Sequence, residues 1–224
     1  MSFLLFLLCL AGIWSWVIEP WTWEPLPIEP APAVKIERYD RVLDEYVSLG
    51  SYTALHHMNT HYPRQTKLLI EQVLQLGRVD EPDIEKRLRT YYLDSTVQVL
   101  LDEVHRQYSD LSDIERRFSY EMRILKNSYP DFHQPHVYAQ ISCLHQSIVV
   151  ADTLIGISLD KYLGADFPIY QNYYSEEQRR QMVRDSIVSD AIAAYKRFLD
   201  DKYFQIARRR WDNPLWEDAI SYPR

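Results

Sequence analysis

The chain has 224 residues, enough for one domain of ordinary size and a leader. Apolar residues make up 46% of the sequence and charged residues 25%, a balance that is typical of a folded domain and excludes a disordered chain. The formal net charge of −7 repels a phosphate backbone, so we expect no nucleic-acid partner. Glycine occurs only 5 times, which favours long helices over many short hairpins.

The first segment, residues 1–18, reads as a hydrophobic signal or anchor segment. Its run from Phe3 to Val17 carries no charge and would span roughly 23 Å as a helix, less than the ~30 Å hydrocarbon core of a bilayer. Tryptophans follow this run closely, as a membrane interface favours. We therefore expect a signal-anchor-like helix that holds the chain at a membrane. Lipidation at Cys9 is disfavoured, because the bulky Leu8 precedes it where a lipobox needs a small residue.

Residues 19–34 are rich in proline and tryptophan, which argues against a regular helix and predicts a stiff tether. Residues 35–224 are expected to form a single globular domain. Apolar residues at helical spacing predict its first helices over Tyr39–Leu49, Arg64–Leu76, Asp83–Tyr92, Ser95–Tyr108 and Leu111–Asn127. Further helices are predicted from Ser175 onward and over Asp185–Ala207, where Ser189 marks a candidate break.

The stretch from residue 136 to residue 158 differs in composition from the predicted helices, because it is rich in β-branched and aromatic residues. Apolar and polar side chains alternate from Val137 to Ser142, as in a half-buried strand, and Ser147–Ala151 and Thr153–Ser158 read as two more strands. A short helical turn is predicted over Leu159–Gly164. The expected fold class is therefore α+β, mainly α-helical, with a small antiparallel sheet.

Two histidine pairs have spacings that could chelate a metal. His57 and His61 are four residues apart, but the nearby Pro63 argues against a stable helix there. His133 and His136 flank a proline-containing loop. Exposure to solvent is the commoner interpretation of such histidines, so we expect neither a metal nor another cofactor. The sequence also lacks a GxSxG elbow and a glycine-rich phosphate loop, while paired-carboxylate hydrolysis stays open.

The most distinctive stretch runs from Ser147 to Tyr174. Its structural interpretation is a strand, a tight passage at Gly156, and local packing of aromatic residues. Its functional interpretation is the rim of a binding cleft, formed by Asp152, Asp160, Tyr162, Asp166 and Tyr170. No catalytic role is assigned to any of them.

This stretch resembles the GldB family of envelope proteins from Bacteroidota. The matching pieces are Ser147–Asp152, Ile155–Asp160, Tyr162–Gly164 and Phe167–Tyr170. A looser similarity extends from Ile36 to about Arg210. Members of this family are typically lipoproteins linked with gliding motility. The resemblance thus implies a location in the cell envelope, anchored to a membrane and facing the periplasm.

The family is also distantly similar to zincin-like peptidases, in which a helix bearing HExxH follows a small sheet. The corresponding helix here would include Ser186–Tyr195, which contains no histidine. Without two imidazoles on that face nothing would hold zinc, and no glutamate is placed to activate water. The resemblance therefore implies a degenerate zincin-like scaffold without the catalytic metal.

These observations favour a non-enzymatic, membrane-associated envelope protein that binds a protein, peptide or glycan partner in gliding, secretion or other envelope machinery. The alternative is a hydrolase, either metal-independent or degenerate, on a zincin-like scaffold. Two carboxylates or two histidines that converge in one pocket would favour this alternative.

Overall fold

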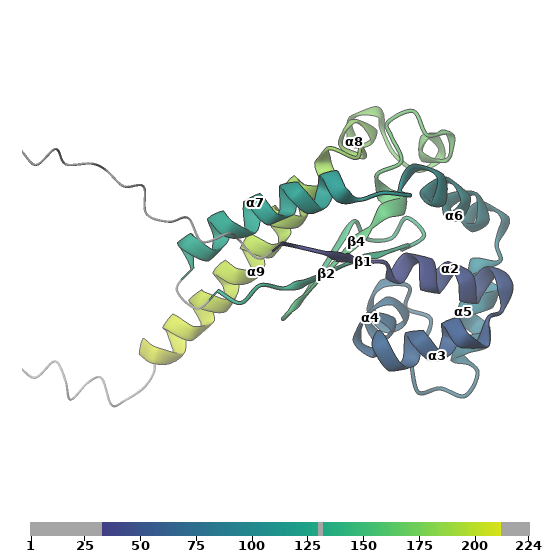
Figure 1. Cartoon of the computed structure of the whole chain (residues 1–224), viewed down its shortest axis with the longest axis horizontal. Helices are drawn as coiled ribbons and strands as arrows, with labels where there is room; N and C mark the ends of the chain where they lie inside the picture. Colours follow the sequence, from purple (N-terminus) through teal and green to yellow (C-terminus); the bar gives the residue numbers. More distant parts are fainter. Residues whose placement is uncertain (1–32, 130–131, 212–224) are drawn as a thin grey trace, which may run out of the picture. The chain divides into compact units, whose positions relative to one another are not determined.

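The computed structural model describes residues 33–129 and 132–211 (Figure 1). The predicted leader, the lipidation question at Cys9 and nearly all of the tether lie outside the described residues. The helices of the first half are α2 (Tyr39–Leu49), α3 (Tyr52–His61), α4 (Pro63–Lys67), the π-helix η1 (Leu68–Val73), α5 (Ile84–Tyr92), α6 (Ser95–Gln107) and α7 (Ser112–Ser128). Within the described ranges, no helix has the length and apolar character needed to cross a membrane.

Most predicted helices of this half are confirmed. Helix α2 has the predicted bounds, and Gly50 ends it in the left-handed conformation, at φ 67°, with its N–H donating to Tyr46 O at 2.8 Å. Helix α6 begins after Asp94, whose carboxylate accepts the N–H groups of Thr96 and Val97 as an N-cap.

Two differences concern residues 51–76. The segment with His57 and His61, where we expected no stable helix, forms α3, because the Ser51 side chain caps it by accepting the Ala54 N–H. Pro63 stands at the first turn of α4, a position that tolerates proline because no N–H is needed there. The single helix predicted from Arg64 is in fact α4 followed by the π-helix η1.

The four strands β1 (Ile36–Glu37), β2 (His136–Gln140), β3 (Ile148–Ala151) and β4 (Leu154–Ser158) form one sheet in the order β1-β2-β4-β3. Strand β2 runs parallel to both β1 and β4, whereas β3 runs antiparallel to β4. The predicted antiparallel sheet is therefore wrong, because the sheet is mixed. Strand β1 was not predicted, since two residues are too few to show an alternating pattern.

The parallel pairing of β2 and β4 follows from the position of β3. The loop after β2 carries the chain to the outer edge of the sheet, and the turn at Asp152 and Thr153 brings β4 back beside β2. All five residues of β4 are buried, as expected for a strand with a neighbour on each side. Alternation in the sequence indicates which face a residue takes, but it does not indicate which strand lies next to it.

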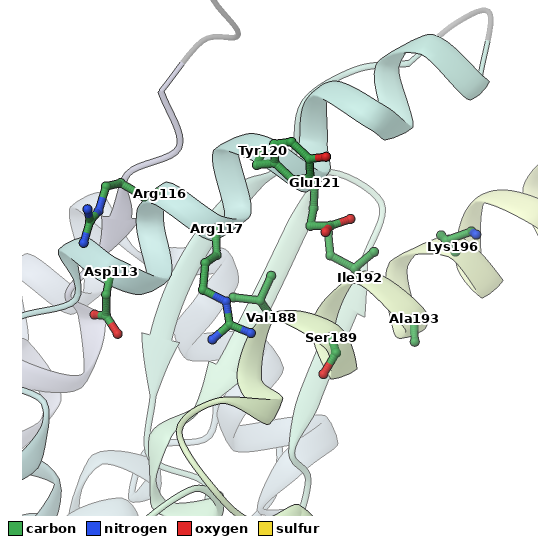
Figure 2. Close-up of a pocket in the computed structure, with 10 residues that line it drawn as sticks. All are labelled: Asp113, Arg116, Arg117, Tyr120, Glu121, Val188, Ser189, Ile192, Ala193 and Lys196. Carbon is green, nitrogen blue, oxygen red and sulfur yellow. The ribbon is translucent and has the colours of Figure 1, made fainter.

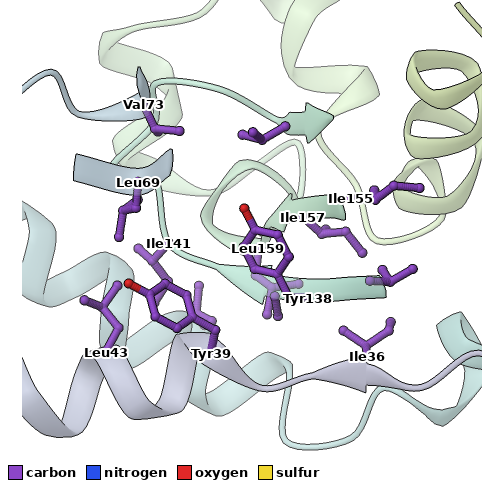
Figure 3. Close-up of a cluster of buried hydrophobic side chains, with 14 of the residues drawn as sticks. Ile36, Tyr39, Leu43, Leu69, Val73, Tyr138, Ile141, Ile155, Ile157 and Leu159 are labelled. Carbon is purple, nitrogen blue, oxygen red and sulfur yellow. The ribbon is translucent and has the colours of Figure 1, made fainter. Parts of the chain in front are cut away.

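A core of buried side chains joins the helices to the sheet (Figure 3). This core includes Tyr39 and Leu43 of α2, Leu69 and Val73 of η1, and Tyr138 of β2, and all five are buried. The rings of Tyr39 and Tyr138 meet edge to face, with centroids 6.1 Å apart. Full burial of one such aliphatic side chain contributes about 1.5–3 kcal/mol, so this layer is a main support of the sheet.

The second half continues with the 3-10 turns η2 (Leu159–Lys161) and η3 (Pro168–Asn172), then α8 (Glu176–Gln181) and α9 (Ser186–Trp211). A capping box between Ser175 and Gln178 begins α8. Helix α9 packs on β3 and β4 and lies beside α7, without a break at Ser189 (Figure 1). The α+β class is thus confirmed, while the described structure gives no support to a zincin-like scaffold.

Candidate functional site

The five predicted cleft residues do not surround one cleft. Asp160, Tyr162 and Tyr170 are buried, whereas Asp152 and Asp166 are exposed. Asp152 lies in the turn before β4 and Asp160 follows the end of β4. A strand of five residues extends roughly 17 Å, so these two carboxylates lie at opposite ends of the sheet.

The buried members of this set hold the fold together. Tyr170 Oη donates to the backbone oxygen of Asp160 at 2.5 Å and accepts the N–H of Leu163 at 2.9 Å. Tyr162 Oη donates to the carboxylate of Asp190 on α9 at 3.0 Å. These bonds satisfy polar groups that burial would otherwise leave unpaired, which agrees with the structural interpretation of the tyrosines.

The Asp160 carboxylate supports the loop that follows β2. One of its oxygens accepts the N–H of Ser142 at 2.8 Å, and the other accepts the N–H of Leu144 at 2.6 Å. Cys143, which lies between these two residues, and Leu144 itself both have positive φ, at 52° and 68°. Non-glycine residues in this conformation cost about 1–3 kcal/mol each, so two in succession need such an anchor.

Lys161 ties the same loop to the segment after η3. Its Nζ donates to the Leu144 backbone oxygen at 3.3 Å and to Tyr174 Oη at 2.7 Å, and it lies 4.3 Å from the centre of the Tyr174 ring. Burial lowers the pKa of the Lys161 ammonium, while the adjacent Asp160 charge opposes this effect. The loop is therefore held by two charged side chains, the carboxylate of Asp160 and the ammonium of Lys161.

The loop forms one wall of a hollow of about 600 Å³, which we call the tyrosine pocket. Tyr91 from the end of α5, Tyr173 and Tyr174 contribute rings, and Asp94 and His145 contribute polar groups. Tyr91 Oη and His145 Nε2 are 3.0 Å apart and hydrogen-bonded. Tyr173 is 62% exposed, so a large aromatic surface faces solvent there. The combination of apolar rings with a few polar groups is typical of a binding site.

The hydroxyl groups of Tyr91 and Tyr174 act as neutral hydrogen-bonding groups. Burial raises the pKa values of Tyr91 and Tyr174, and the Asp160 charge raises them further. Burial also raises the pKa of the Cys143 thiol, which keeps it protonated and weakly nucleophilic. The pocket therefore offers contact surface and hydrogen bonds rather than an activated nucleophile.

A second hollow, of about 670 Å³, lies between α7 and α9 (Figure 2). Val188 and Ile192 of α9 are its buried residues, and Tyr120 of α7 is 55% exposed at its wall. Glu121 and Lys196 carry opposite charges on its two sides. We call it the α7–α9 groove; it shares no lining residue with the tyrosine pocket.

The histidine pairs stand apart from both hollows. The rings of His57 and His61 meet edge to face, with centroids 4.3 Å apart on α3. His136 lies 3.4 Å from the carboxylate of Glu37. In residues 33–129 and 132–211, no group of three or more histidine, cysteine, aspartate or glutamate side chains is arranged to hold a metal.

The residues of the tyrosine pocket could not be predicted together, because they come from three distant segments. Tyr91, His145 and Tyr173 share no local pattern that would join them. One feature of the sequence pointed to strain in the loop after β2: the loop must turn sharply between strands, yet it contains no glycine.

The fold and the pocket define the class of this protein: a mainly helical α+β protein with a mixed four-stranded sheet and an open aromatic pocket beside it. Over residues 24–208 the chain matches the family model described as the gliding motility protein GldB. The chain belongs to this family, which confirms the resemblance found in its sequence and associates it with gliding motility lipoproteins. Neither a curated protein nor a solved structure matches the chain.

Proposed function

We propose that this chain is a non-enzymatic envelope protein of the gliding machinery that binds a partner protein or peptide in the tyrosine pocket. The observation that carries this proposal is the strained loop at Cys143 and Leu144, which forms a pocket wall and is held by Asp160. Strained backbone persists where the surrounding structure enforces it, and such places are frequently functional.

The chemistry of the pocket supports binding rather than catalysis. Tyrosine is enriched in protein interfaces and in their energetic hot spots, and Tyr173 presents most of its surface to solvent. The pocket wall carries one carboxylate, Asp94, whose Oδ1 already caps α6, and one histidine, His145, which is bonded to Tyr91. Paired carboxylates or paired histidines, which would favour the hydrolase alternative, are not among its lining residues.

Attachment to the envelope is a second part of the proposal. The apolar run from Phe3 to Val17 would hold the chain at a membrane, with the globular part on the periplasmic side. Ile13 stands where a lipobox after Leu10-Ala11-Gly12 would need cysteine, so we expect an anchor without lipid. Intact-mass analysis of the protein purified from membranes tests this, and an acylated chain that begins at Cys9 would refute it.

A site-specific photo-crosslinker tests the pocket in gliding cells. We expect a crosslinker at position 173 to capture one discrete envelope protein, and Tyr173→Ala to reduce both that capture and colony spreading. Tyr120→Ala is the matched control, because Tyr120 is similarly exposed, at 55%, but lies in the α7–α9 groove. Equal spreading by the two variants, or cleavage of a peptide or glycan by the purified protein, would contradict the proposal.

A further inference from the structure

The sheet has two edges, and they differ in how their backbone groups are satisfied. At the β1 edge, the Ile36 N–H donates to the carboxylate of Glu115 at 3.0 Å, so a side chain occupies the donor that a further strand would need. The other edge is β3, which pairs with β4 on one side. A strand edge with open N–H and C=O groups is a template for another extended chain.

The register of β3 shows which groups face outward. The Ser158 N–H donates to the Ser147 oxygen at 2.9 Å, which makes these two residues a hydrogen-bonded pair. Hydrogen-bonded and non-bonded pairs alternate along an antiparallel ladder, so Val149 bonds to Gly156, whereas Ile148 and Val150 direct their backbone groups away from β4.

Nothing in the described part of the chain satisfies these outward groups. The N–H and C=O groups of Ile148 and Val150 have no hydrogen-bond partner among the described residues. Both residues are partly exposed, whereas Val149 between them is buried. Two N–H donors and two C=O acceptors are therefore presented together along one edge.

The sequence of β3 also lacks the usual protection of an exposed edge. In natural proteins, lysine, proline, inward-pointing charges or bulges prevent an exposed edge strand from pairing with another chain. The segment Ser147–Ala151 reads SIVVA and has neither a charge nor a proline, although β3 is short, at four residues. Such an apolar, uncharged edge favours pairing with another strand.

We propose that the free edge of β3 binds an extended segment of a partner polypeptide, which adds a fifth strand to the sheet. This inference rests on the proposed function and names the form of the partner: a strand rather than a helix or a glycan. Ile148 follows the pocket residue His145 by three positions, so the edge begins within about 10 Å of chain from the wall of the tyrosine pocket. A second copy is a poorer occupant, because each copy carries a net charge of −7 and offers an equally short edge.

Amide hydrogen exchange of the full chain in detergent tests the free edge directly. We expect the amides of Ile148 and Val150 to exchange much faster than that of Val149, which donates to β4. Equal protection of the three amides in the free protein would mean that the edge is already covered, which overturns the proposal.

Linear peptides selected by phage display on the full chain provide the binding probe. Val150→Pro removes one outward N–H and keeps the β3–β4 bonds, since proline is tolerated at an edge where the N–H faces solvent. We expect it to weaken the selected peptides about fivefold to tenfold, the effect of about one hydrogen bond. Methylation of alternate peptide amides should weaken binding to the unchanged protein similarly, and this measurement stands even if the proline variant fails to fold.

The outcomes separate this inference from the proposed function. Peptides that lose affinity on Tyr173→Ala but bind Val150→Pro normally would support the tyrosine pocket and overturn strand addition. Peptides that bind as helices would also overturn it. A wild-type dimer that dissociates on Val150→Pro would show that a second copy occupies the edge, which contradicts the partner proposed here. Protection of the Ile148 and Val150 amides by the peptide is the supporting result.

Discussion

Tyr138 and Gly156 face each other across β2 and β4, and the tyrosine ring fills the space that a side chain at position 156 would need. A Cβ atom at Gly156 would lie 2.6 Å from both Cζ and Oη of Tyr138. Gly156→Ala should therefore lower the free energy of unfolding by about 1–3 kcal/mol, the usual cost of overpacking a core. Urea denaturation measures this. Gly156→Ala should cost much less in a Tyr138→Leu background, and an equal cost in both would show that the ring contact is not the cause.

The hydroxyl of Tyr138 gives a second prediction. Tyr138 is buried, and its Oη has no hydrogen-bond partner among the described residues. Tyr138→Phe should leave the free energy of unfolding unchanged or raise it by up to about 1 kcal/mol, because an unpaired buried hydroxyl is unfavourable. Tyr92→Phe is the control: Tyr92 is equally buried but donates to the Ile141 oxygen, so its loss should cost about 1 kcal/mol. A larger cost at Tyr138 than at Tyr92 would contradict this account.

The anchor below the pocket loop can be tested with Asp160→Asn. An amide offers one acceptor oxygen, so its NH₂ group would meet the N–H of either Ser142 or Leu144 in place of a carboxylate oxygen. We expect a loss of about 2 kcal/mol or more in the free energy of unfolding, and faster exchange of the Leu144 amide. The exposed Asp166→Asn should change stability by less than about 0.5 kcal/mol. Unchanged exchange at Leu144 would argue against this anchoring role.

The ion pair between Asp113 and Arg184 predicts a pH dependence. Hydrogen bonds from Arg184 at 3.0 and 2.6 Å lower the pKa of Asp113 below its ordinary value of 3.8. A lowered pKa stabilises the folded state above the unfolded pKa, and this contribution is lost as the pH falls through the folded pKa. Because Asp113 is 43% exposed, Asp113→Asn should cost only about 0.5 kcal/mol near neutral pH.

Measuring the free energy of unfolding over a series of pH values tests the contribution of the Asp113–Arg184 pair. The stability difference between wild type and Asp113→Asn should shrink as the pH falls below 3.8 and disappear once Asp113 is protonated in both states. Asp185→Asn is the control, because Asp185 is 95% exposed and lies 3.4 Å from Arg117, so its effect should be smaller at every pH. A difference that grows as the pH falls would contradict the assignment.

The histidine pair on α3 leads to a prediction about zinc. His57 and His61 could supply two ligands, but structural zinc sites use four, and residues 33–129 and 132–211 offer no third histidine, cysteine or carboxylate nearby in a group. We expect elemental analysis of the purified protein to find far less than one zinc per chain. About one zinc per chain that is lost on His57→Ala and His61→Ala would overturn this.

The helices were the most predictable part of the fold. The apolar stripe of α2 predicted both of its ends, and α6 ends within one residue of its prediction, because caps and side-chain spacing are local properties. The pairing of strands is not local. The alternation along β2 predicted a strand correctly, but its parallel neighbours, β1 and β4, depend on where the loop after β2 takes the chain.

The candidate site was harder still to predict, because it too depends on contacts between distant segments. The sequence predicted Asp160 at the rim of a binding cleft, whereas in the folded chain its oxygens support a loop. Whether a carboxylate lines a cleft or supports a loop depends on its burial, which the sequence does not reveal. Tyr91 and Tyr173 each look like ordinary helix-end or loop tyrosines, and only the folded chain brings them to one pocket.

The short strand β1 would take a mechanical load under the proposed attachment of the chain at its N-terminal side. The chain enters the described fold at Val34, whose N–H donates to Ser119 Oγ at 2.9 Å, and Glu115 of the same helix, α7, accepts the Ile36 N–H and pairs with Lys35 at 3.0 Å. A pull from the membrane side would thus load these bonds and the parallel β1–β2 pairing along the strand direction, so that they share the force and do not open one after another. Under the proposed role in gliding, this junction would carry tension from the membrane into the sheet.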